Sequence, residues 1–472
     1  MYPSPKNSSL LSLILLIYGS VFTGFAQSQS AKKPNVIIIM ADDLDSRQLS
    51  CYGGKNLRTT HIDALASEGM KFNQIYTSEA MCVPTRASLF TGLYPVRHGS
   101  FQNHKPVYDN LKSVGHYLAD LGYRVGLTGK DHSTKPKTVF PFEIVKGFEP
   151  NCVAPTDDYD LNDVKEYITR TSQPYCLFVM SINPHTPWTV GDTTEFNADK
   201  LILPKNWVDT KVTRRQFMKY LAEVRRLDNQ VGDITQLLKE TGQDKNTIVI
   251  FLGEQGAQFP GAKWNLWDVG QKSSMLVKWP GTVKPGTQTD ALVQYEDITP
   301  TLIDVAGGKP IAGPSSLGLD GKSFLPVLFG KSTKAREYAY GIHNNIPEGN
   351  PYPIRSIRDT RYKLILNLTP DQAYYNRFMM NAKKQDPDSV WSSWTKQAVS
   401  DPAAKRITER FEKRPAVEFY DTQTDPWELN NLATNPAYQE RISQYRKKLD
   451  DWMKQQGDTG ASLDIIYTKK KE

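Results

Sequence analysis

The sequence predicts an α/β fold in which a large, mixed, mostly parallel sheet is sandwiched by helices, with a smaller C-terminal α+β subdomain. Three observations lead to this prediction. Apolar runs rich in Val, Ile and Leu alternate with amphipathic helical runs from residue 35 to residue 281. These apolar runs end abruptly in polar loops, as parallel strands do at the sheet edge where ligands bind. Beyond about residue 330, strand-like runs separated by polar turns replace this alternation.

The composition is that of a globular protein with a large core. Of the 472 residues, 39% are hydrophobic and 23% are charged, which excludes a largely disordered chain. The formal net charge of +7 fits an anionic substrate and equally fits a solvated surface. The sequence has no long basic stripe and no basic patch interleaved with aromatic residues, so we expect no nucleic-acid partner.

Residues 1–26 are typical of a secretory signal peptide. The apolar run LLSLILLIYGSVF is followed by Gly24 and Ala26, a small-x-small pattern at a cleavage point. An uncleaved membrane anchor is the alternative, but the run is shorter than the roughly 20 apolar residues that a span needs. We therefore expect a periplasmic or secreted protein without stable membrane insertion. That compartment permits disulfides, although four cysteines are too few for a disulfide scaffold.

The predicted elements alternate as a parallel sheet requires. Residues 35–44, NVIIIMADDL, form a buried strand that ends in acids, and a short helix with a glycine stop follows within residues 60–72. A helix and then a strand occupy residues 111–130. The later elements, in chain order, are a buried strand in 173–187, a long helix in 213–242 and strands in 247–256 and 273–281.

Residues 34–330 are therefore predicted to form the larger domain, and residues 331–472 the C-terminal subdomain. In the subdomain, residues 357–368 and 417–433 have the pattern of antiparallel hairpin strands. Residues 435–457 have the pattern of a closing helix.

Two adjacent acids, Asp42 and Asp43, end the first predicted strand. Adjacent carboxylates in one crevice repel each other unless a cation lies between them. The pair is therefore suited to bind a hard divalent metal ion. The alternative is a solvated loop in which an aspartate caps a helix. Taken alone, the pair leaves both interpretations open.

Cys82 stands where a helix is expected to begin. Pro84 suits the first turn of that helix, and Arg86 is expected on the same helical face, beside the thiol. The unpaired amides of a helix N-terminus favour negative charge. A cysteine in this place is more often simply buried. The other interpretations are a nucleophile, a metal ligand and half of a disulfide.

The string CVPTRASLFTGLYP, residues 82–95, resembles the signature of the type I, formylglycine-dependent sulfatases of the alkaline-phosphatase-like superfamily. The segments PNVIIIMADDL, GKDH, NPHTP and FYDTQTDPWELNNLA occur in the family's order, so the resemblance covers residues 34 to about 450. The segments around GKDH and FPGAKWNLW are most similar to the sulfamidase, or heparan N-sulfatase, branch.

The resemblance implies roles for individual residues. A formylglycine-generating maturation enzyme would oxidise Cys82 to Cα-formylglycine, whose hydrate is the family's nucleophile. Asp42, Asp43 and the formylglycine would bind one calcium ion, and Arg86 would hold and polarise the formylglycine. Lys130, in GKDH, would contact the sulfate.

Three further positions belong to the implied catalytic set. His132, also in GKDH, matches the histidine that acts on the formylglycine hydrate. His185, in NPHTP, matches the histidine near the leaving group. Lys263 stands where the family has a basic residue on the sulfate.

One strand end departs from the family pattern. Many sulfatases read Ser-Asp-Asn-Gly or Ser-Asp-His-Gly where this chain has Gly-Glu-Gln-Gly at residues 253–256. Glu254 and Gln255 keep a carboxylate and an amide oxygen, each on a side chain one methylene longer. Calcium accepts varied oxygen geometry, and we therefore expect both residues to be metal ligands.

These expectations describe a sulfatase that removes ester sulfate or N-sulfate from sulfated oligosaccharides or polysaccharides. A phosphatase or phosphodiesterase on the same fold is one alternative. Such relatives place Ser or Thr at the nucleophile position and hold two zinc ions, whereas only His132 and His185 of the seven histidines here are suitably placed. A non-catalytic relative that binds sulfated glycans is the other alternative, which the variation at Glu254 and Gln255 leaves open.

Overall fold

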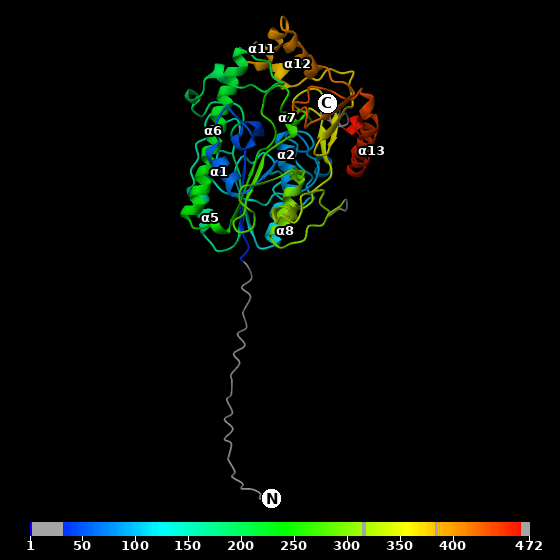
Figure 1. Cartoon of the computed structure of the whole chain (residues 1–472). Coiled ribbons are helices and arrows are strands. Elements are labelled where there is room, and N and C mark those ends of the chain that lie inside the picture. Colours follow the sequence, from blue (N-terminus) through cyan, green and yellow to red (C-terminus); the bar gives the residue numbers. More distant parts are fainter. Residues whose placement is uncertain (2–31, 314–317, 383–385, 387, 464–472) are drawn as a thin grey trace. The chain divides into compact units, whose positions relative to one another are not determined.

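Eight strands form the central sheet of the computed structural model, which describes residues 1, 32–313, 318–382, 386 and 388–463 (Figure 1). Their order across the sheet is β5-β4-β6-β1-β7-β8-β2-β9. The bounds are β1 Asn35–Met40, β2 Met70–Phe72, β4 Arg124–Gly129, β5 Glu143–Ile144, β6 Tyr175–Met180, β7 Thr247–Leu252, β8 Met275–Lys278 and β9 Thr287–Thr289. Neighbouring strands are parallel except where β8 pairs with β7 and with β2. The predicted large, mixed, mostly parallel sheet is confirmed.

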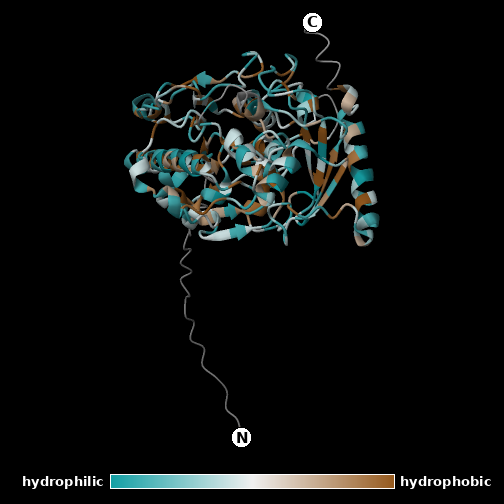
Figure 2. Cartoon of the chain, turned by 90° about the horizontal axis from the view of Figure 1, so that it is seen from above, coloured by the Kyte–Doolittle hydropathy of each residue, from teal (hydrophilic) through white to brown (hydrophobic). Residues whose placement is uncertain are grey.

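The side chains of β1 alternate between the two faces of this sheet. Ile37 and Ile39 join one hydrophobic cluster, whereas Val36, Ile38 and Met40 join another. A parallel strand that is buried on both faces needs apolar residues at every position, which explains the unbroken run. The helices that supply the two clusters are α1 Thr60–Glu68, α5 Asn162–Thr169 and α6 Lys211–Glu240 for the first, and α2 Cys82–Thr91, α4 Val114–Asp120 and α8 Ile298–Val305 for the second. Figure 2 shows hydrophobic residues gathered on the strands and hydrophilic residues on outer helical surfaces.

Helix α2 begins at Cys82, as the sequence predicts. Every residue of this helix is buried, so it runs through the interior rather than along the surface. It ends at Gly92, whose φ of 70° lies in the left-handed region typical of a helix C-terminus. The first turn of α2 is therefore held rigidly inside the protein.

A four-stranded antiparallel sheet forms the C-terminal part of the fold, in the order β11-β12-β13-β14. Its strands are β11 Ala339–His343, β12 Ile354–Arg358, β13 Tyr362–Asn367 and β14 Val417–Asp421. Helix α13, Gln439–Gln456, packs on it through Tyr445, Leu449 and Trp452. The predicted small antiparallel sheet and closing helix are confirmed, while the domain boundary at residue 330 stays a prediction.

Several elements are not among those predicted from the sequence. Helices α11 Val390–Ala398 and α12 Pro402–Glu412 stand between β13 and β14. The remaining short elements are β3 Ile75–Tyr76, β10 Val293–Gln294, α3 Pro95–His98, α7 Asp268–Gln271, α9 Leu325–Leu328 and α10 Arg377–Ala382. Such short segments carry too few residues to show a period.

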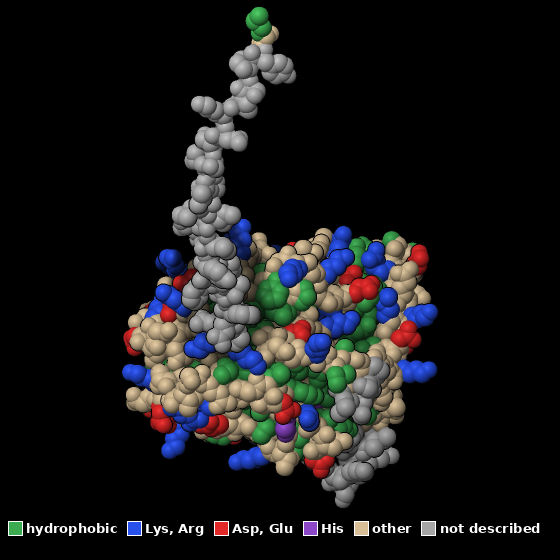
Figure 3. Space-filling model, turned by 90° about the horizontal axis from the view of Figure 1, so that it is seen from below, with side chains coloured by type: hydrophobic (Ala, Val, Ile, Leu, Met, Phe, Trp, Pro, Cys, Tyr) green, Lys and Arg blue, Asp and Glu red, His purple; other side chains and the backbone are tan. Residues whose placement is uncertain are grey.

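The sequence also makes predictions about a signal peptide, membrane insertion and surface charge. The predicted signal peptide, residues 1–26, lies outside the described residues apart from Met1. In the described part of the chain, no helix is both long and apolar enough to cross a membrane. On the face shown in Figure 3, lysine and arginine side chains are interspersed with aspartate and glutamate.

Candidate active site

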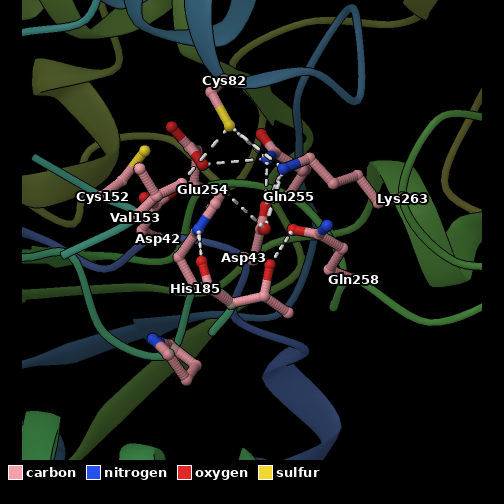
Figure 4. Close-up of polar contacts among 12 residues, drawn as sticks. Asp42, Asp43, Cys82, Cys152, Val153, His185, Glu254, Gln255, Gln258 and Lys263 are labelled. Atoms are coloured by element: carbon pink, nitrogen blue, oxygen red, sulfur yellow. Dashed lines mark hydrogen bonds and ion pairs between the residues drawn. The ribbon is translucent and has the colours of Figure 1, made fainter. Parts of the chain in front are cut away.

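The carboxyl ends of four adjacent strands carry most of the predicted site residues. In strand order, β4, β6, β1 and β7 are followed by Lys130, His185, the pair Asp42 and Asp43, and the pair Glu254 and Gln255. Because these strands are parallel neighbours, their carboxyl ends open on the same edge of the sheet. Cys82 reaches this edge from the first turn of α2, and Lys263 reaches it from the loop after β7 (Figure 4).

Backbone geometry at two strand ends makes the convergence possible. Gly129 ends β4 with a φ of 83°, and a Cβ there would lie 2.1 Å from the carbonyl oxygen of Met180. No other residue fits at this position without moving the neighbouring strand. Asp43 has a φ of 59°, in the left-handed region that residues with a Cβ rarely adopt. Backbone strain of this kind is typical of functional sites.

The thiol of Cys82 lies at the centre of a cluster of charged and polar groups. Its Sγ is 3.2 Å from Lys263 Nζ, 3.5 Å from Gln255 Nε2 and 3.7 Å from Asp42 Oδ1. Burial, and then the carboxylate of Glu254, raise the pKa of this thiol well above its usual range. An unmodified Cys82 is therefore protonated at neutral pH, and a protonated thiol is a weak nucleophile.

Each acid of the cluster contacts a cation. The short contacts are Lys130 Nζ to Asp42 Oδ2 at 2.5 Å, Lys263 Nζ to Asp43 Oδ1 at 2.7 Å, and Arg86 Nε to Glu254 Oε1 at 2.6 Å. All six side chains are buried. Charges held at such short distances inside a protein interact strongly and cost a large free energy if one partner is removed.

These contacts set the ionisation of the cluster. Burial opposes ionisation of Asp42, but Lys130 and His185 hold its pKa below the usual range. Burial opposes protonation of Lys263, but Asp43 raises the pKa of that ammonium well above its usual range. Both lysines therefore carry positive charge at neutral pH, beside Cys82.

The acids also fit a metal ion. Asp42, Asp43, Cys82 and Glu254 each offer one ligand atom, and these atoms lie within 4.8 Å of one another. Burial raises the pKa of Glu254, and the nearby Asp42 adds to that effect against the opposing charge of Arg86. A crowded acid that favours its proton is one whose proton a divalent cation can replace. Carboxylate oxygens are the ligands that calcium prefers, so the donor set fits calcium.

Gln255 is oriented as a donor in this arrangement. Its Nε2 donates to Asp43 Oδ1 at 2.6 Å and to Glu254 Oε2 at 2.9 Å, while its Oε1 accepts from Thr85 Oγ1 at 3.3 Å. The amide oxygen becomes a metal ligand only when the amide group turns over. Of the two variant positions, Glu254 is therefore the one already placed as a ligand.

Arg86 pairs with Glu254 through Nε and, in the described part of the chain, leaves its terminal nitrogens without acceptors. Its terminal nitrogens are buried and have no hydrogen-bond partner among the described residues; one of them lies 3.7 Å from Asp42 Oδ1. Buried N–H groups without acceptors are unfavourable. Together with Lys130 and Lys263, Arg86 forms a set of three cations suited to an anion with several oxygens.

The two predicted catalytic histidines lie in different surroundings. His185 places Nδ1 2.5 Å from the carbonyl oxygen of Thr186, which holds the proton on Nδ1, and Nε2 3.6 Å from Asp43 Oδ2. His132 lies at the rim, with its ring exposed and Nε2 3.7 Å from the Sγ of Cys152. Partial burial and the charges of Lys130 and Arg86 lower the pKa of His132, which is neutral at pH 7.

Two residues near the site carried no signal in the sequence. Cys152 and His104 stand in loops outside any motif, and both contact His132: Cys152 Sγ lies 3.7 Å from His132 Nε2, and the ring centroids of His104 and His132 are 5.5 Å apart. A sequence pattern marks residues at strand ends, but it does not show which loops fold back over them.

Comparison with known proteins gives matches along almost the whole chain. The model of the Sulfatase family matches residues 34–308, and the model described as N-sulphoglucosamine sulphohydrolase, C-terminal, matches residues 262–416. An ulvan-active sulfatase of Formosa agariphila is 32% identical over 437 residues, which is 91% of this chain and 82% of the relative. The human N-sulphoglucosamine sulphohydrolase is 27% identical over 467 residues, which is 89% of this chain and 90% of the relative.

A solved structure has the same fold. It is that of a protein in complex with its substrate D-glucosamine-2-N,6-O-disulfate, with a TM-score of 0.69, 18% identity, and coverage of 91% of this chain and 99% of the other. The family model covers more than half of the chain, including the strand ends and the helix on which the site is built. The resemblance drawn from the motif at Cys82 is thus confirmed: the chain belongs to the sulfatase family, in the branch of N-sulphoglucosamine sulphohydrolase, and is a sulfuric ester hydrolase.

Proposed function

We propose that the protein removes sulfate groups from sulfated oligosaccharides or polysaccharides, using a formylglycine made from Cys82 and one calcium ion. One observation carries the proposal: Cys82 Sγ lies 3.2 to 3.7 Å from a lysine, an amide and a carboxylate, where buried cations meet metal-ligating acids. The substrate class is supported by relatives named as an ulvan-active sulfatase and an N-sulphoglucosamine sulphohydrolase.

The cations of the site have a direct use in such a reaction. A sulfate monoester is negatively charged, and that charge must be neutralised before a nucleophile approaches the sulfur. Lys130, Lys263 and Arg86 are fixed by ion pairs before any substrate arrives. Preorganised charges of this kind are usually the largest single contribution to catalysis.

The residues that would hold the metal are Asp42, Asp43, Glu254 and, after its amide turns over, Gln255. Calcium bound there supplies further positive charge against the sulfate oxygens. Formylglycine at position 82, as its hydrate, supplies the hydroxyl nucleophile that the protonated thiol does not.

The histidines would move protons. With Nδ1–H donated to the Thr186 carbonyl, His185 directs Nε2 into the site. Burial lowers the pKa of this ring, against the opposing charges of Asp42 and Asp43, so Nε2 carries no proton at rest. Nε2 must first take up a proton, which it would then give to the leaving oxygen or nitrogen. His132 is neutral and at the rim, so it is available as the base that removes a proton from residue 82. Burial lowers the pKa of both rings, so their positions distinguish the two roles: His185 lies beside the metal-ligating acid Asp43, and His132 lies at the rim.

The test compares the wild type with Cys82→Ala and Cys82→Ser, each produced with a formylglycine-generating enzyme. We expect kcat/KM on 4-nitrophenyl sulfate and on sulfated oligosaccharides to fall by a factor of about 1000 or more in both variants. Cys51→Ala, which changes a cysteine outside the site, serves as the matched control. Mass spectrometry of the wild-type peptide around residue 82 is expected to show a loss of about 18 Da, the change from thiol to aldehyde.

Other outcomes would point elsewhere. Full sulfatase activity in Cys82→Ala contradicts the proposal. Faster turnover of 4-nitrophenyl phosphate than of the sulfate favours a phosphatase. Binding of sulfated oligosaccharides without turnover, although residue 82 has lost the 18 Da expected of maturation, favours a non-catalytic relative.

We further propose a periplasmic or secreted location, supported by the signal-peptide pattern of residues 1–26. Cell fractionation and N-terminal sequencing of the mature protein test it. A mature chain that begins near residue 27 and lies outside the cytoplasm is the expected result, and an intact N-terminus in the cytoplasm contradicts it.

A further inference from the structure

A pocket of about 650 Å³ opens beside the active site. Two loops, residues 104–109 and 132–136, form most of its wall, and Val83 completes it. Val83 follows Cys82 in the chain, and His132 belongs to the proposed catalytic set. A ligand in this pocket therefore lies next to a sulfate held at position 82.

The pocket has an apolar surface suited to a sugar. Pro106, Val107 and Pro136 line it together with Tyr108, a residue that keeps 43% of its surface exposed. The Tyr108 ring packs directly against Gly99, where a Cβ would lie 2.8 Å from the ring. An exposed aromatic ring held in place by its neighbours offers a flat face for the C–H groups of a pyranose.

Hydrogen-bond donors also line the pocket, next to its apolar surface. Lys135 and His104 both line the pocket; Lys135 is exposed, and 52% of the His104 side chain is exposed. Lys105 turns its ammonium over the Phe101 ring, 4.7 Å from the centroid, so its charge lies against the wall. Asp109 is the acidic residue among those that line the pocket, and the two lysines outweigh it.

His104 is placed to respond to an anion. Its Nε2 is 3.9 Å from Glu348 Oε1. Burial lowers its pKa, against the opposing effect of Glu348. A neutral imidazole donates one hydrogen bond, and a nearby anion favours the protonated form with two donors.

We propose that this pocket binds the part of the glycan next to the scissile sulfate, and that Lys135 and His104 select substrates with a second anionic group there. That group is a carboxylate, as in a uronic acid, or a second sulfate; both present several acceptor oxygens to the two donors. The inference rests on the proposed function for the position of the scissile sulfate.

The experiment uses three oligosaccharides that share one scissile sulfate and differ at the adjacent position: neutral, carboxylate or second sulfate. For the wild type we expect a KM about tenfold lower for at least one anionic substrate than for the neutral one, with similar kcat. Lys135→Ala and His104→Ala are each expected to remove most of that difference through KM. Lys137→Ala, an exposed lysine of the same loop that does not line the pocket, is expected to keep it. Comparison of the carboxylate and the second sulfate identifies which anion is selected.

A binding measurement separates this inference from the proposed function. Calorimetry with the Cys82→Ala protein records the affinity for the same three oligosaccharides, and no turnover is required. Equal affinities for all three, or an unchanged preference in Lys135→Ala and His104→Ala, overturn the inference even when the wild type hydrolyses 4-nitrophenyl sulfate. A preference in binding without any sulfate hydrolysis supports the pocket and contradicts the proposed reaction.

Discussion

Glu254 occupies a position where one extra methylene changes the contacts of the site. Its longer side chain accepts from Arg86 Nε at 2.6 Å, and a carboxylate oxygen lies within 4.8 Å of those of Asp42 and Asp43. The same carboxylate therefore pairs with the buried guanidinium of Arg86 and is also a proposed ligand of calcium. Its neighbour Gln255 donates from its amide nitrogen to Asp43 and to Glu254.

Glu254→Gln keeps the length of the side chain and removes its charge. We expect calcium affinity to fall at least about tenfold, because a metal ligand loses its negative charge and Arg86 loses its partner. Calorimetric titration of the purified full chain with calcium measures it. Glu240→Gln, the same change on an exposed residue at the end of α6, is the control. Unchanged affinity in Glu254→Gln would mean that Glu254 serves Arg86 alone.

Strand β4 and its neighbours β6, β1 and β7 bring the site together because their parallel ends share one edge. The end of β4 is tightly packed, since residue 129 lies against the backbone of β6. Lys130, the next residue, forms the 2.5 Å ion pair with Asp42. The position of that lysine therefore depends on the small size of Gly129.

Gly129→Ala tests this dependence. The new methyl group meets a carbonyl oxygen at 2.1 Å and also needs a positive φ, so we expect a loss of at least about 2 kcal/mol in unfolding free energy and a large loss of kcat. Gly122→Ala has a similar φ of 82° but nothing within 4 Å of the new Cβ. It is expected to show only the backbone effect, about 1 kcal/mol, with activity retained. Equal effects of the two changes on stability and activity would rule out the close approach as the cause.

The interior of the fold also holds neutral histidines far from solvent. His98 is buried, its Nδ1 accepts from the Ser100 amide at 3.1 Å, and its Nε2 lies 3.2 Å from Ser88 Oγ. Burial lowers the pKa of this ring from 6.5 to about 3. The folded state thus keeps His98 neutral at a pH where the unfolded state takes up a proton.

This difference predicts acid sensitivity of stability. Between pH 6.5 and about 3, the unfolded chain binds a proton that the native chain does not, so stability is present above pH 6.5 and is lost as pH falls. One such group contributes at most about 1.4 kcal/mol per pH unit. We expect the thermal unfolding temperature to fall less steeply between pH 7.5 and pH 5 in His98→Asn than in the wild type. His61→Asn, on an exposed ring, is the control; parallel curves for wild type and His98→Asn would exclude His98 as a source.

Local patterns in the chain were enough to predict much of the site. Residues 35–44 show a buried strand that ends in Asp42 and Asp43, and residues 82–95 show the motif at Cys82. Each of these signals lies within a few residues of its own strand or helix. The loop that carries His104 follows no period and no motif, so its place could not be predicted. Helices α11 and α12 do have apolar residues at helical spacing, Trp391 and Trp394 in one and Ala404 and Phe411 in the other, but a period shows a helix and not where that helix packs.

The order of elements, the strand ends that carry the site and the family follow from the sequence alone, because periodicity and motifs are local properties of the chain. The three-dimensional structure settles which side chains meet. Cys82 and Lys263 are 181 positions apart, and Arg86 and Glu254 are 168 apart, yet both pairs are in contact. Such contacts depend on the order of strands across the sheet and on the depth of burial, which no local pattern contains. For the same reason, only the folded chain reveals the pocket beside position 82 and the two donors that face it.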